Sequence, residues 1–180
     1  MQEHEGGFLH PEQILEHTAV VKPGMKVADF GCGAGHFTLA LARAVGSSGT
    51  VFAFDVLKSA LNSVESAAKR EGLFQIKTAW SDLESIKGSK LRDGEIDAAF
   101  AVNVLYQVPD KDAFLKEAWR VLRGKGFLVV VDWDAHALAG PPMQERVAKE
   151  ELKRKIQAMG FDLRNEFAPG KFHYGLLFQK

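Results

Sequence analysis

Apolar runs bounded by turn residues alternate with segments of helical spacing along this chain, and this alternation limits the fold more than any other feature. It predicts a parallel sheet with helices on both faces, because parallel strands need crossover connections. The predicted strands span residues 26–30, 50–54, 74–79, 96–102 and 127–131. The predicted helices span residues 11–20, 37–45, 58–71, 111–123 and 142–159.

The end of the chain departs from this alternation. Residues 161–167 and 172–178 are two further apolar runs, and they flank the turn-forming pair Pro169 and Gly170. Two such runs around a short turn predict an antiparallel hairpin. The sequence therefore predicts a Rossmann-like, doubly wound α/β fold. Its seven-stranded sheet is expected to be mostly parallel, with an antiparallel C-terminal hairpin strand.

Composition and charge set the broad class of the protein. No linker or repeat interrupts the chain, so we expect a single domain over residues 1–180, with residues 1–10 as a flexible lead or a lid that offers Phe8 and Leu9 as apolar contacts. Lys plus Arg and Asp plus Glu number 23 each, which gives no electrostatic reason to expect nucleic acid as the main partner. The one cysteine cannot form an internal disulfide, which favours a reducing, cytoplasmic location.

The sequence supports neither a membrane-spanning helix nor a metal site. No apolar run approaches the ~20 residues of a membrane-spanning helix. The His, Cys, Asp and Glu residues show no metal-ligand spacing, so no metal is expected. The protein is expected to be a monomer or a homodimer.

The stretch VADFGCGAGHF follows the first predicted strand and contains three alternating glycines, Gly31, Gly33 and Gly35. Glycine allows positive φ and lets a ligand lie against the backbone. The helix that begins after Gly35 directs its free N–H groups toward the same place. Loops at the carboxyl ends of parallel strands are where such sheets bind ligands. The stretch therefore predicts a binding loop.

Asp55 ends the second predicted strand, in VFAFDV. A carboxylate at this position can accept hydrogen bonds from both hydroxyl groups of a ribose. Together with the glycine loop, Asp55 predicts a nucleoside ligand. The dinucleotide pattern G-x-G-x-x-G does not fit, because its third glycine would fall at position 36, which is His36. The pattern here is D-x-G-x-G-x-G, beginning at Asp29.

At this point the sequence resembles the class I S-adenosylmethionine-dependent methyltransferases, over nearly the whole chain. VADFGCGAG matches their first motif. The resemblance implies S-adenosyl-L-methionine as the cofactor, with the glycine loop around its methionine part and Asp29 near its amino group. It also implies that Asp55 holds the ribose and that Val56 lies beside the adenine. The C-terminal hairpin matches the antiparallel seventh strand of this family.

Two further motifs carry the resemblance. Ser81, Asp82 and Leu83 resemble the motif after the third strand, which implies that Asp82 accepts a hydrogen bond from the adenine amino group. Asn103, in IDAAFAVNVL, falls at the fourth motif, and the resemblance implies that it lies beside the methyl donor.

The stretch NVLYQVPDKDAFLKEAWRVLRGKGFLVVVDW resembles quinone- and sterol-biosynthesis methyltransferases, the "type 11" small-molecule branch. This implies that Asn103 and Tyr106 line the acceptor pocket, and that the methyl group goes to an O, N or C atom of a small, possibly apolar acceptor. The N/D-P-P-Y motif of amino-methylating enzymes is absent, since residues 103–106 read NVLY. The single cysteine also excludes the three-cysteine chemistry of arsenic methylation.

A general base is the least determined part of the site. Asp132 and His136 follow the fifth predicted strand, at the edge where the methyl group should point. His136 is our candidate, because histidine has a pKa near 6.5 and can take a proton from an O or N nucleophile. Trp133 is a candidate wall for a planar substrate. His173 and Tyr174, in the hairpin, are expected to be structural.

Other functions stay open at this stage. An RNA or protein methyltransferase is one alternative, because a large substrate needs no enclosing pocket. A module that binds the nucleoside cofactor without turnover is a second, and a dinucleotide-dependent oxidoreductase is a third. The predicted helix over residues 142–159 mixes basic and acidic residues, which indicates a solvated face rather than a basic edge for RNA phosphates.

Overall fold

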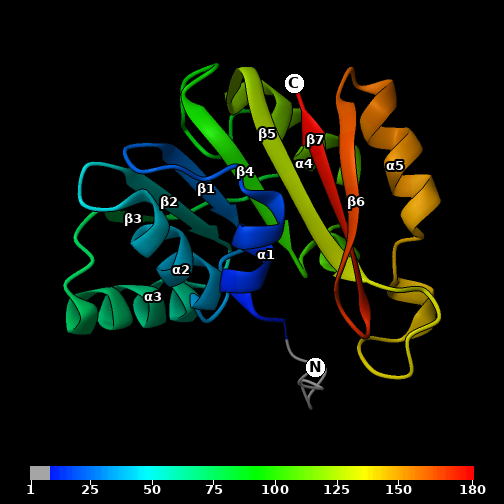
Figure 1. Cartoon of the computed structure of the whole chain (residues 1–180), viewed down its shortest axis with the longest axis horizontal. Helices are drawn as coiled ribbons and strands as arrows, with labels where there is room; N and C mark the ends of the chain where they lie inside the picture. Colours follow the sequence, from blue (N-terminus) through cyan, green and yellow to red (C-terminus); the bar gives the residue numbers. More distant parts are fainter. Residues whose placement is uncertain (1–8) are drawn as a thin grey trace.

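Within residues 9–180, which the computed structural model describes, seven strands form one sheet in the order β3-β2-β1-β4-β5-β7-β6 (Figure 1). Neighbours from β3 to β5 pair in parallel, and β7 is antiparallel to both β5 and β6. The predicted fold class is confirmed, including the antiparallel hairpin. The strands are β1 (Lys26–Phe30), β2 (Thr50–Asp55), β3 (Ile76–Trp80), β4 (Ile96–Val102), β5 (Leu122–Trp133), β6 (Asp162–Gly170) and β7 (His173–Gln179).

Helices cover both faces of this sheet. One layer contains α1, α2 and α3, whose apolar residues pack on Val27, Ala53 and Val129. The other contains α4 and α5, which pack on Ala28 and Leu128. Residues next to each other in β1 and in β5 thus face opposite layers, as strand geometry requires. The helices are α1 (Pro11–Thr18), α2 (His36–Val45), α3 (Lys58–Glu71), α4 (Lys111–Val121) and α5 (Lys149–Ala158), with short 3₁₀ turns η1 (Leu105–Gln107) and η2 (Met143–Glu145).

The helix predicted over residues 142–159 is wrong in its first half. Only η2 and then extended backbone precede α5, with ψ of 140° at Pro142 and 146° at Arg146. The Pro141–Pro142 pair disfavours helix at its first residue. Tertiary contacts then hold the segment extended, because Val147 is buried and its carbonyl accepts a hydrogen bond of 3.0 Å from the Tyr174 hydroxyl.

Two of the other boundaries that differ from the sequence prediction have a clear cause. The helix predicted over residues 111–123 ends at Val121, because Leu122 turns extended and pairs with Ile96 at the start of β5. Gly170 pairs with His173, so residues 171–172 form the hairpin turn in place of the predicted Pro169–Gly170 turn.

The predicted lead over residues 1–10 lies mostly outside the described residues, Phe8 included; Leu9 and His10 alone belong to the described part. His10 precedes the first turn of α1. None of the helices between residues 9 and 180 has the length and apolar character needed to cross a bilayer.

Candidate functional site

A cavity of about 560 Å³ opens at the carboxyl edge of the sheet, where the loops after β1, β2, β3 and β4 meet. The strand order reverses here, because β2 lies on one side of β1 and β4 on the other. Open α/β sheets bind their ligands at such a point. Every residue that the sequence assigns to the cofactor lines this cavity: Asp29, Gly31, Gly33, Gly35, Asp55, Val56, Ser81, Asp82, Leu83 and Asn103.

The three glycines of the loop have positive φ, but they serve different purposes. A Cβ atom on Gly31 would lie 2.5 Å from Val104, and one on Gly35 would lie 2.8 Å from Val64. These two positions therefore exclude side chains because of protein packing. Gly33, with φ of +50°, has no atom within 4 Å of the place where its Cβ would be. Gly33 is thus the position where the bare backbone faces open space in the cavity.

Asp55 fixes the conformation of this loop. Its Oδ2 accepts a hydrogen bond of 2.9 Å from the backbone N–H of Gly33, and its Oδ1 accepts one of 2.8 Å from that of Leu57. An ionised carboxylate has about four lone-pair sites. Each oxygen of Asp55 therefore keeps acceptor capacity for a ligand hydroxyl group while it holds the protein backbone.

Asp29 is the buried carboxyl group of the site, with 1% of its surface exposed. The Thr38 hydroxyl, in α2, donates a hydrogen bond of 2.6 Å to its Oδ2. Burial raises the pKa of Asp29 to about 6, and the charge of Asp55 adds to this effect. A cation in the cavity would favour the ionised form of Asp29.

Two buried polar atoms of the lining have no hydrogen-bond partner within residues 9–180, the Ser81 hydroxyl and the Asn103 Oδ1. Buried polar atoms are normally paired, so both call for a polar ligand or water. Asn103 is held in place by its backbone N–H, which donates to Val131, and its φ is +52°. Cys32, between the first two loop glycines, is buried. Burial raises the pKa of the Cys32 thiol, which stays protonated.

The side of the cavity after β3 combines polar and apolar groups. Asp82 lines it and is oriented locally, because its Oδ1 accepts from the Glu84 N–H and its Oδ2 from the Ser85 hydroxyl. Val56 and Leu83 line the same cavity, and Val56 is 55% exposed. An exposed valine at a cavity wall is available for contact with a flat apolar ring.

The structure places the two remaining candidates, Tyr106 and His136, outside the lining of this cavity. Tyr106 belongs to η1, and its backbone N–H donates to Asp132 at 3.3 Å. Burial, and then the charges of Asp132 and Glu145, raise the pKa of the Tyr106 hydroxyl. His136 is exposed in the loop after β5, where its backbone N–H donates to the carboxylate of Asp134. Their catalytic roles stay predictions.

Several lining residues lie outside the sequence motifs. Leu9 and Phe37 contribute apolar surface, and Glu84 and Gln107 contribute polar atoms. Phe37 ends the stretch VADFGCGAGHF and Glu84 directly follows Leu83, so nearness to a motif was the available signal. No sequence signal marked Gln107, because it reaches the cavity only through the η1 turn. Within the part of the chain that the structure describes, no group of three or more His, Cys, Asp or Glu side chains could hold a metal ion.

Comparison with known proteins agrees with this geometry. A family model described as "Methyltransferase domain" matches residues 21–171. An arsenite methyltransferase of Aquipseudomonas alcaligenes is 33% identical over 134 residues, which cover 69% of this chain and 39% of that protein. A demethylmenaquinone methyltransferase of a Geobacillus species is 32% identical over 120 residues, which cover 67% of this chain and 50% of that protein. The chain thus spans about a third to a half of the length of the curated relatives it matches.

Solved structures give the same result over a larger part of the chain. A SAM-dependent methyltransferase from Aquifex aeolicus superposes with a TM-score of 0.86 and 27% identity, over 95% of this chain and 89% of that one. The match to the methyltransferase domain model covers most of the chain, from the strand that precedes the glycine loop to the C-terminal hairpin. The chain therefore belongs to the class I S-adenosylmethionine-dependent methyltransferases.

Proposed function

We propose that this protein transfers a methyl group from S-adenosylmethionine to an O, N or C atom of a small molecule. The observation that supports this most is the cavity at the strand-order reversal, which gathers the glycine loop, two carboxyl groups and Asn103. The curated relatives are longer than this chain, so their activities do not transfer to it directly. The proposal therefore rests on the site itself.

The residues of the cavity fit the chemical groups of this cofactor. Asp29 offers a buried carboxylate for its ammonium group, and Asp55 offers acceptor capacity for its ribose hydroxyls. The open space at Gly33 allows the ligand to approach the backbone. The unpaired Oδ1 of Asn103 and the Ser81 hydroxyl supply further polar contacts. When bound, the cofactor supplies an electrophilic methyl group on a positively charged sulfur.

Positioning is the main task left to the protein. A well-oriented acceptor beside an electrophile gains roughly 7–11 kcal/mol from alignment alone. The side chains after β4 and β5 would orient the acceptor, and any proton on the attacking atom would leave to a base or to water. Within residues 9–180, the possible bases in the lining of the cavity are His36, Glu84 and the carboxyl groups already assigned to the cofactor.

A small acceptor is favoured over a macromolecule. The relatives named after arsenite, demethylmenaquinone and sterols all carry small acceptors in their names. This chain has one cysteine, Cys32, which is buried in the glycine loop and protonated. Arsenite binding needs thiolate ligands, so arsenite is the least suitable of the three acceptor types for this chain.

A labelled-methyl assay with fractionated acceptors tests the proposal. The protein is incubated with tritiated S-adenosylmethionine and with separate pools of small metabolites, RNA and protein. We expect label in the small-molecule pool. Label confined to RNA or protein would establish the macromolecular alternative instead.

Calorimetry with S-adenosylhomocysteine and NAD separates the remaining alternatives. We expect the first to bind and the second not to. Tight binding of S-adenosylhomocysteine without any methyl transfer would identify a binding module without turnover. Binding of NAD alone would contradict the assignment of the cavity.

A further inference from the structure

Three ring nitrogen atoms are buried without a hydrogen-bond partner at the carboxyl edge of the sheet, outside the cofactor cavity. They are Nε1 of Trp133 and both Nδ1 and Nε2 of His173, and no partner for them lies within the described chain. His173 is 5% exposed. Buried polar groups are almost always paired in native proteins. Three unpaired donors and acceptors in one place therefore call for a polar ligand or water.

The two rings form one aromatic surface. Trp133 is the last residue of β5 and His173 is the first of β7, and the two are directly opposite in the antiparallel pair. Their ring centroids lie 4.1 Å apart with an interplanar angle of 38°. Both belong to the face of the sheet that α1 and α2 cover, because the alternate residues Val131 and Leu177 pack there. A planar molecule can pack against such a surface.

The strands that carry this aromatic pair lie next to segments that line the cofactor cavity. Asn103, which lines the cavity, donates its N–H to Val131, two residues before Trp133 in β5. On the other side, Gly170 pairs with His173 in the hairpin, and a Cβ on Gly170 would contact the side chain of Leu9 at 3.9 Å. Leu9 lines the cavity as well. Asn103 and Leu9 therefore lie beside the chain neighbours of the pair, Val131 in β5 and Gly170 in the hairpin.

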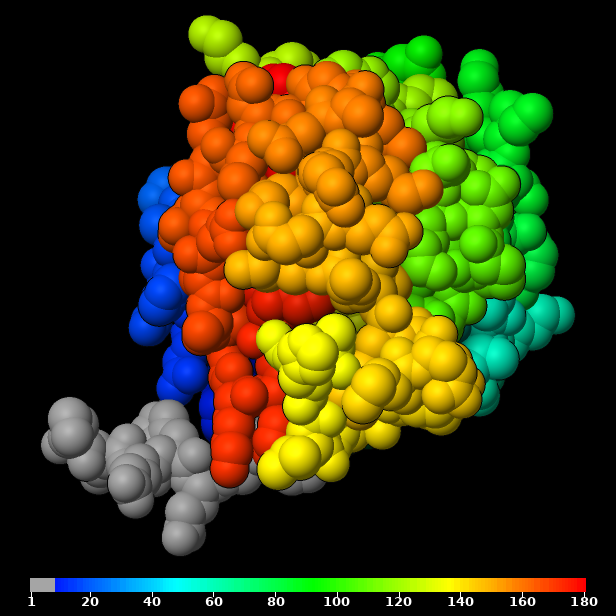
Figure 2. Space-filling view, turned by 90° about the vertical axis from the view of Figure 1, so that its right-hand side faces the viewer, coloured from blue at the N-terminus to red at the C-terminus, as the bar shows by residue number. Residues whose placement is uncertain are grey.

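A loop between β5 and α5, residues 134–148, closes over Trp133. Gly140 lies so close that a Cβ there would be 2.4 Å from the indole ring. Figure 2 shows this loop, in yellow, against the red start of β7. The Arg146 guanidinium holds it, donating hydrogen bonds of 2.7–3.1 Å to the carbonyl oxygens of Asp134, Ala137, Ala139 and Pro141.

The middle of the loop has few anchors other than this side chain. Leu138 and Met143 are 95% and 65% exposed, so they contribute little packing to it. The ends of the loop are held as well, by the backbone N–H of Asp134, which donates to the carbonyl oxygen of Phe172, and by the buried Val147, whose carbonyl oxygen accepts from the Tyr174 hydroxyl.

The chemistry of the two rings defines the ligand. Burial lowers the pKa of His173 to about 4, so the imidazole is neutral at neutral pH. A neutral imidazole has one donor and one acceptor, and an indole has one donor. Together they match an uncharged group that both donates and accepts, such as a phenolic hydroxyl.

We propose that Trp133 and His173 form the acceptor subsite of this methyltransferase, and that it binds an uncharged planar molecule with a hydroxyl group beneath the 134–148 loop. This inference rests on the proposed methyl transfer. It assigns acceptor binding to His173, which was expected from the sequence to be structural, in place of the exposed His136. It also gives Trp133 the wall position that the sequence suggested for it.

Nuclear magnetic resonance with 4-methylphenol as the probe tests the subsite. ¹⁵N-labelled protein is saturated with S-adenosylhomocysteine and titrated with 4-methylphenol, and in parallel with toluene, which has the same shape without the hydroxyl group. The indole signal of Trp133 is identified with Trp133→Phe, and the imidazole signals of His173 with His173→Gln. The indole signal of Trp119, which packs on Phe161 and Lys180 at the opposite edge of the sheet, is the internal control.

We expect 4-methylphenol to shift both the Trp133 and the His173 signals saturably and to leave the Trp119 signal unchanged. We expect toluene to bind about tenfold more weakly or not at all, and His173→Gln to weaken the phenol by a similar factor. Equal shifts with toluene, or shifts that spare both rings, would overturn the inference. Because both probes are compared on the wild-type protein and Trp133→Phe identifies the indole signal, the comparison decides the question even if His173→Gln does not fold.

The outcome is distinguishable from failure of the proposed function. If S-adenosylhomocysteine binds but the phenol leaves both rings unaffected, the acceptor subsite is wrong and the cofactor cavity stands. If S-adenosylhomocysteine itself does not bind, the proposed function is contradicted, and the acceptor subsite falls with it.

Discussion

At the scale of single residues, Gly33 is the loop position where a substitution should weaken cofactor binding without disturbing the packing of the protein. Of the three loop glycines, it alone would direct a side chain into open cavity rather than into protein. A methyl group at Gly33 should therefore obstruct a ligand that approaches the backbone, at the cost of a modest strain from φ of +50°.

Gly33→Ala is expected to weaken S-adenosylhomocysteine binding by a factor of about 30 or more, corresponding to about 2 kcal/mol. Calorimetry measures the affinity, and circular dichroism checks the fold. Gly72→Ala is the matched control, because Gly72 also has positive φ, at +68°, and no close contact, but lies at the end of α3. A Gly33→Ala protein that binds as tightly as the control would show that the loop does not cradle the ligand.

Asp29 gives cofactor binding a pH dependence of known sign. Its pKa in the free protein is raised from 3.8 to about 6 by burial, so below pH 6 it is mostly protonated. The proposed contact of Asp29 with the ammonium group of the cofactor requires the ionised form, and such a contact lowers this pKa on binding. Affinity should therefore be constant above pH 6 and fall as the pH drops below it, by up to tenfold per unit.

Calorimetry with S-adenosylhomocysteine from about pH 5 to 7 measures this effect, in a window where an α-amino group stays protonated. The Asp29→Asn variant should bind weakly at pH 7 and show no change between pH 5 and 7. Equal wild-type affinities at the two pH values would mean that Asp29 does not face the ammonium group.

At the scale of elements, the sequence predicted the strands around the site well, and the reason is physical. β1 and β4 are buried on both faces, and their apolar runs leave little choice of structure. The loops that follow them carry the motif residues, so the cavity lining could also be anticipated. The segment before α5 could not be predicted, because its backbone is held by the distant Tyr174 and by Arg146 rather than by local propensity.

The acceptor side of the site was hard to predict for the same reason. Trp133 and His173 lie 40 positions apart and meet only through the antiparallel pairing of β5 and β7. Trp133 was a candidate only because it follows the fifth predicted strand, and no local pattern marks His173 as functional. His136 instead followed a strand directly, as site residues often do, but the loop carries it into solvent.

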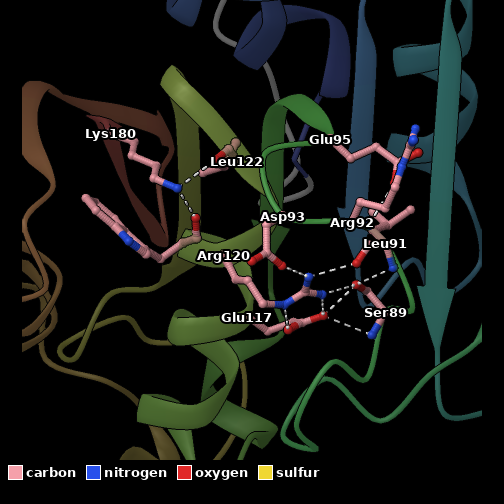
Figure 3. A network of polar contacts seen from close by, with 10 residues as sticks. Ser89, Leu91, Arg92, Asp93, Glu95, Glu117, Arg120, Leu122 and Lys180 are labelled. Carbon is pink, nitrogen blue, oxygen red and sulfur yellow. Dashed lines mark hydrogen bonds and ion pairs between the residues drawn. The ribbon is translucent and has the colours of Figure 1, made fainter.

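The edge of the sheet opposite the cavity is stabilised by a polar network around Arg120, in α4 (Figure 3). Its guanidinium donates hydrogen bonds to the carboxylates of Glu117, at 2.7 Å, and Asp93, at 2.6 Å, and to the carbonyl oxygen of Leu91, at 2.8 Å. Glu117 is 4% exposed and also accepts from the backbone N–H of Ser89. The network ties the loop before β4 to α4.

Arg120→Met should lower the free energy of unfolding by about 2–3 kcal/mol, because it leaves the carboxylate of Glu117 buried without its cation. Urea denaturation measures this loss. Arg164→Met is the control, since Arg164 pairs with Asp162 where both side chains are exposed, and such pairs contribute about 0–1 kcal/mol. Similar losses in the two variants would show that burial of Glu117 does not decide the effect.

At the scale of the whole molecule, the cavity connects parts of the chain that are far apart in sequence. Its lining runs from Leu9, before α1, through the loops after four strands to Phe114 in α4. A ligand there contacts both helical layers, since Leu9 packs with the α1–α2 layer and Phe114 with the α4–α5 layer. Cofactor binding is therefore expected to stabilise the fold as a unit rather than one loop.

The size of this stabilisation follows from mass action. A ligand at 100 times its Kd adds about 2.7 kcal/mol to the free energy of unfolding. For a protein of this size each kcal/mol raises the Tm by about 2–4 °C, so S-adenosylhomocysteine at that excess should raise the Tm by about 5–10 °C. Calorimetric scanning at pH 7 measures the shift, and NAD at the same concentration should give none. Because the bound state needs ionised Asp29, the shift should shrink at pH 5 at the same ligand concentration. A shift equal at both pH values would place the stabilising contact away from Asp29, even with the cofactor bound in the cavity.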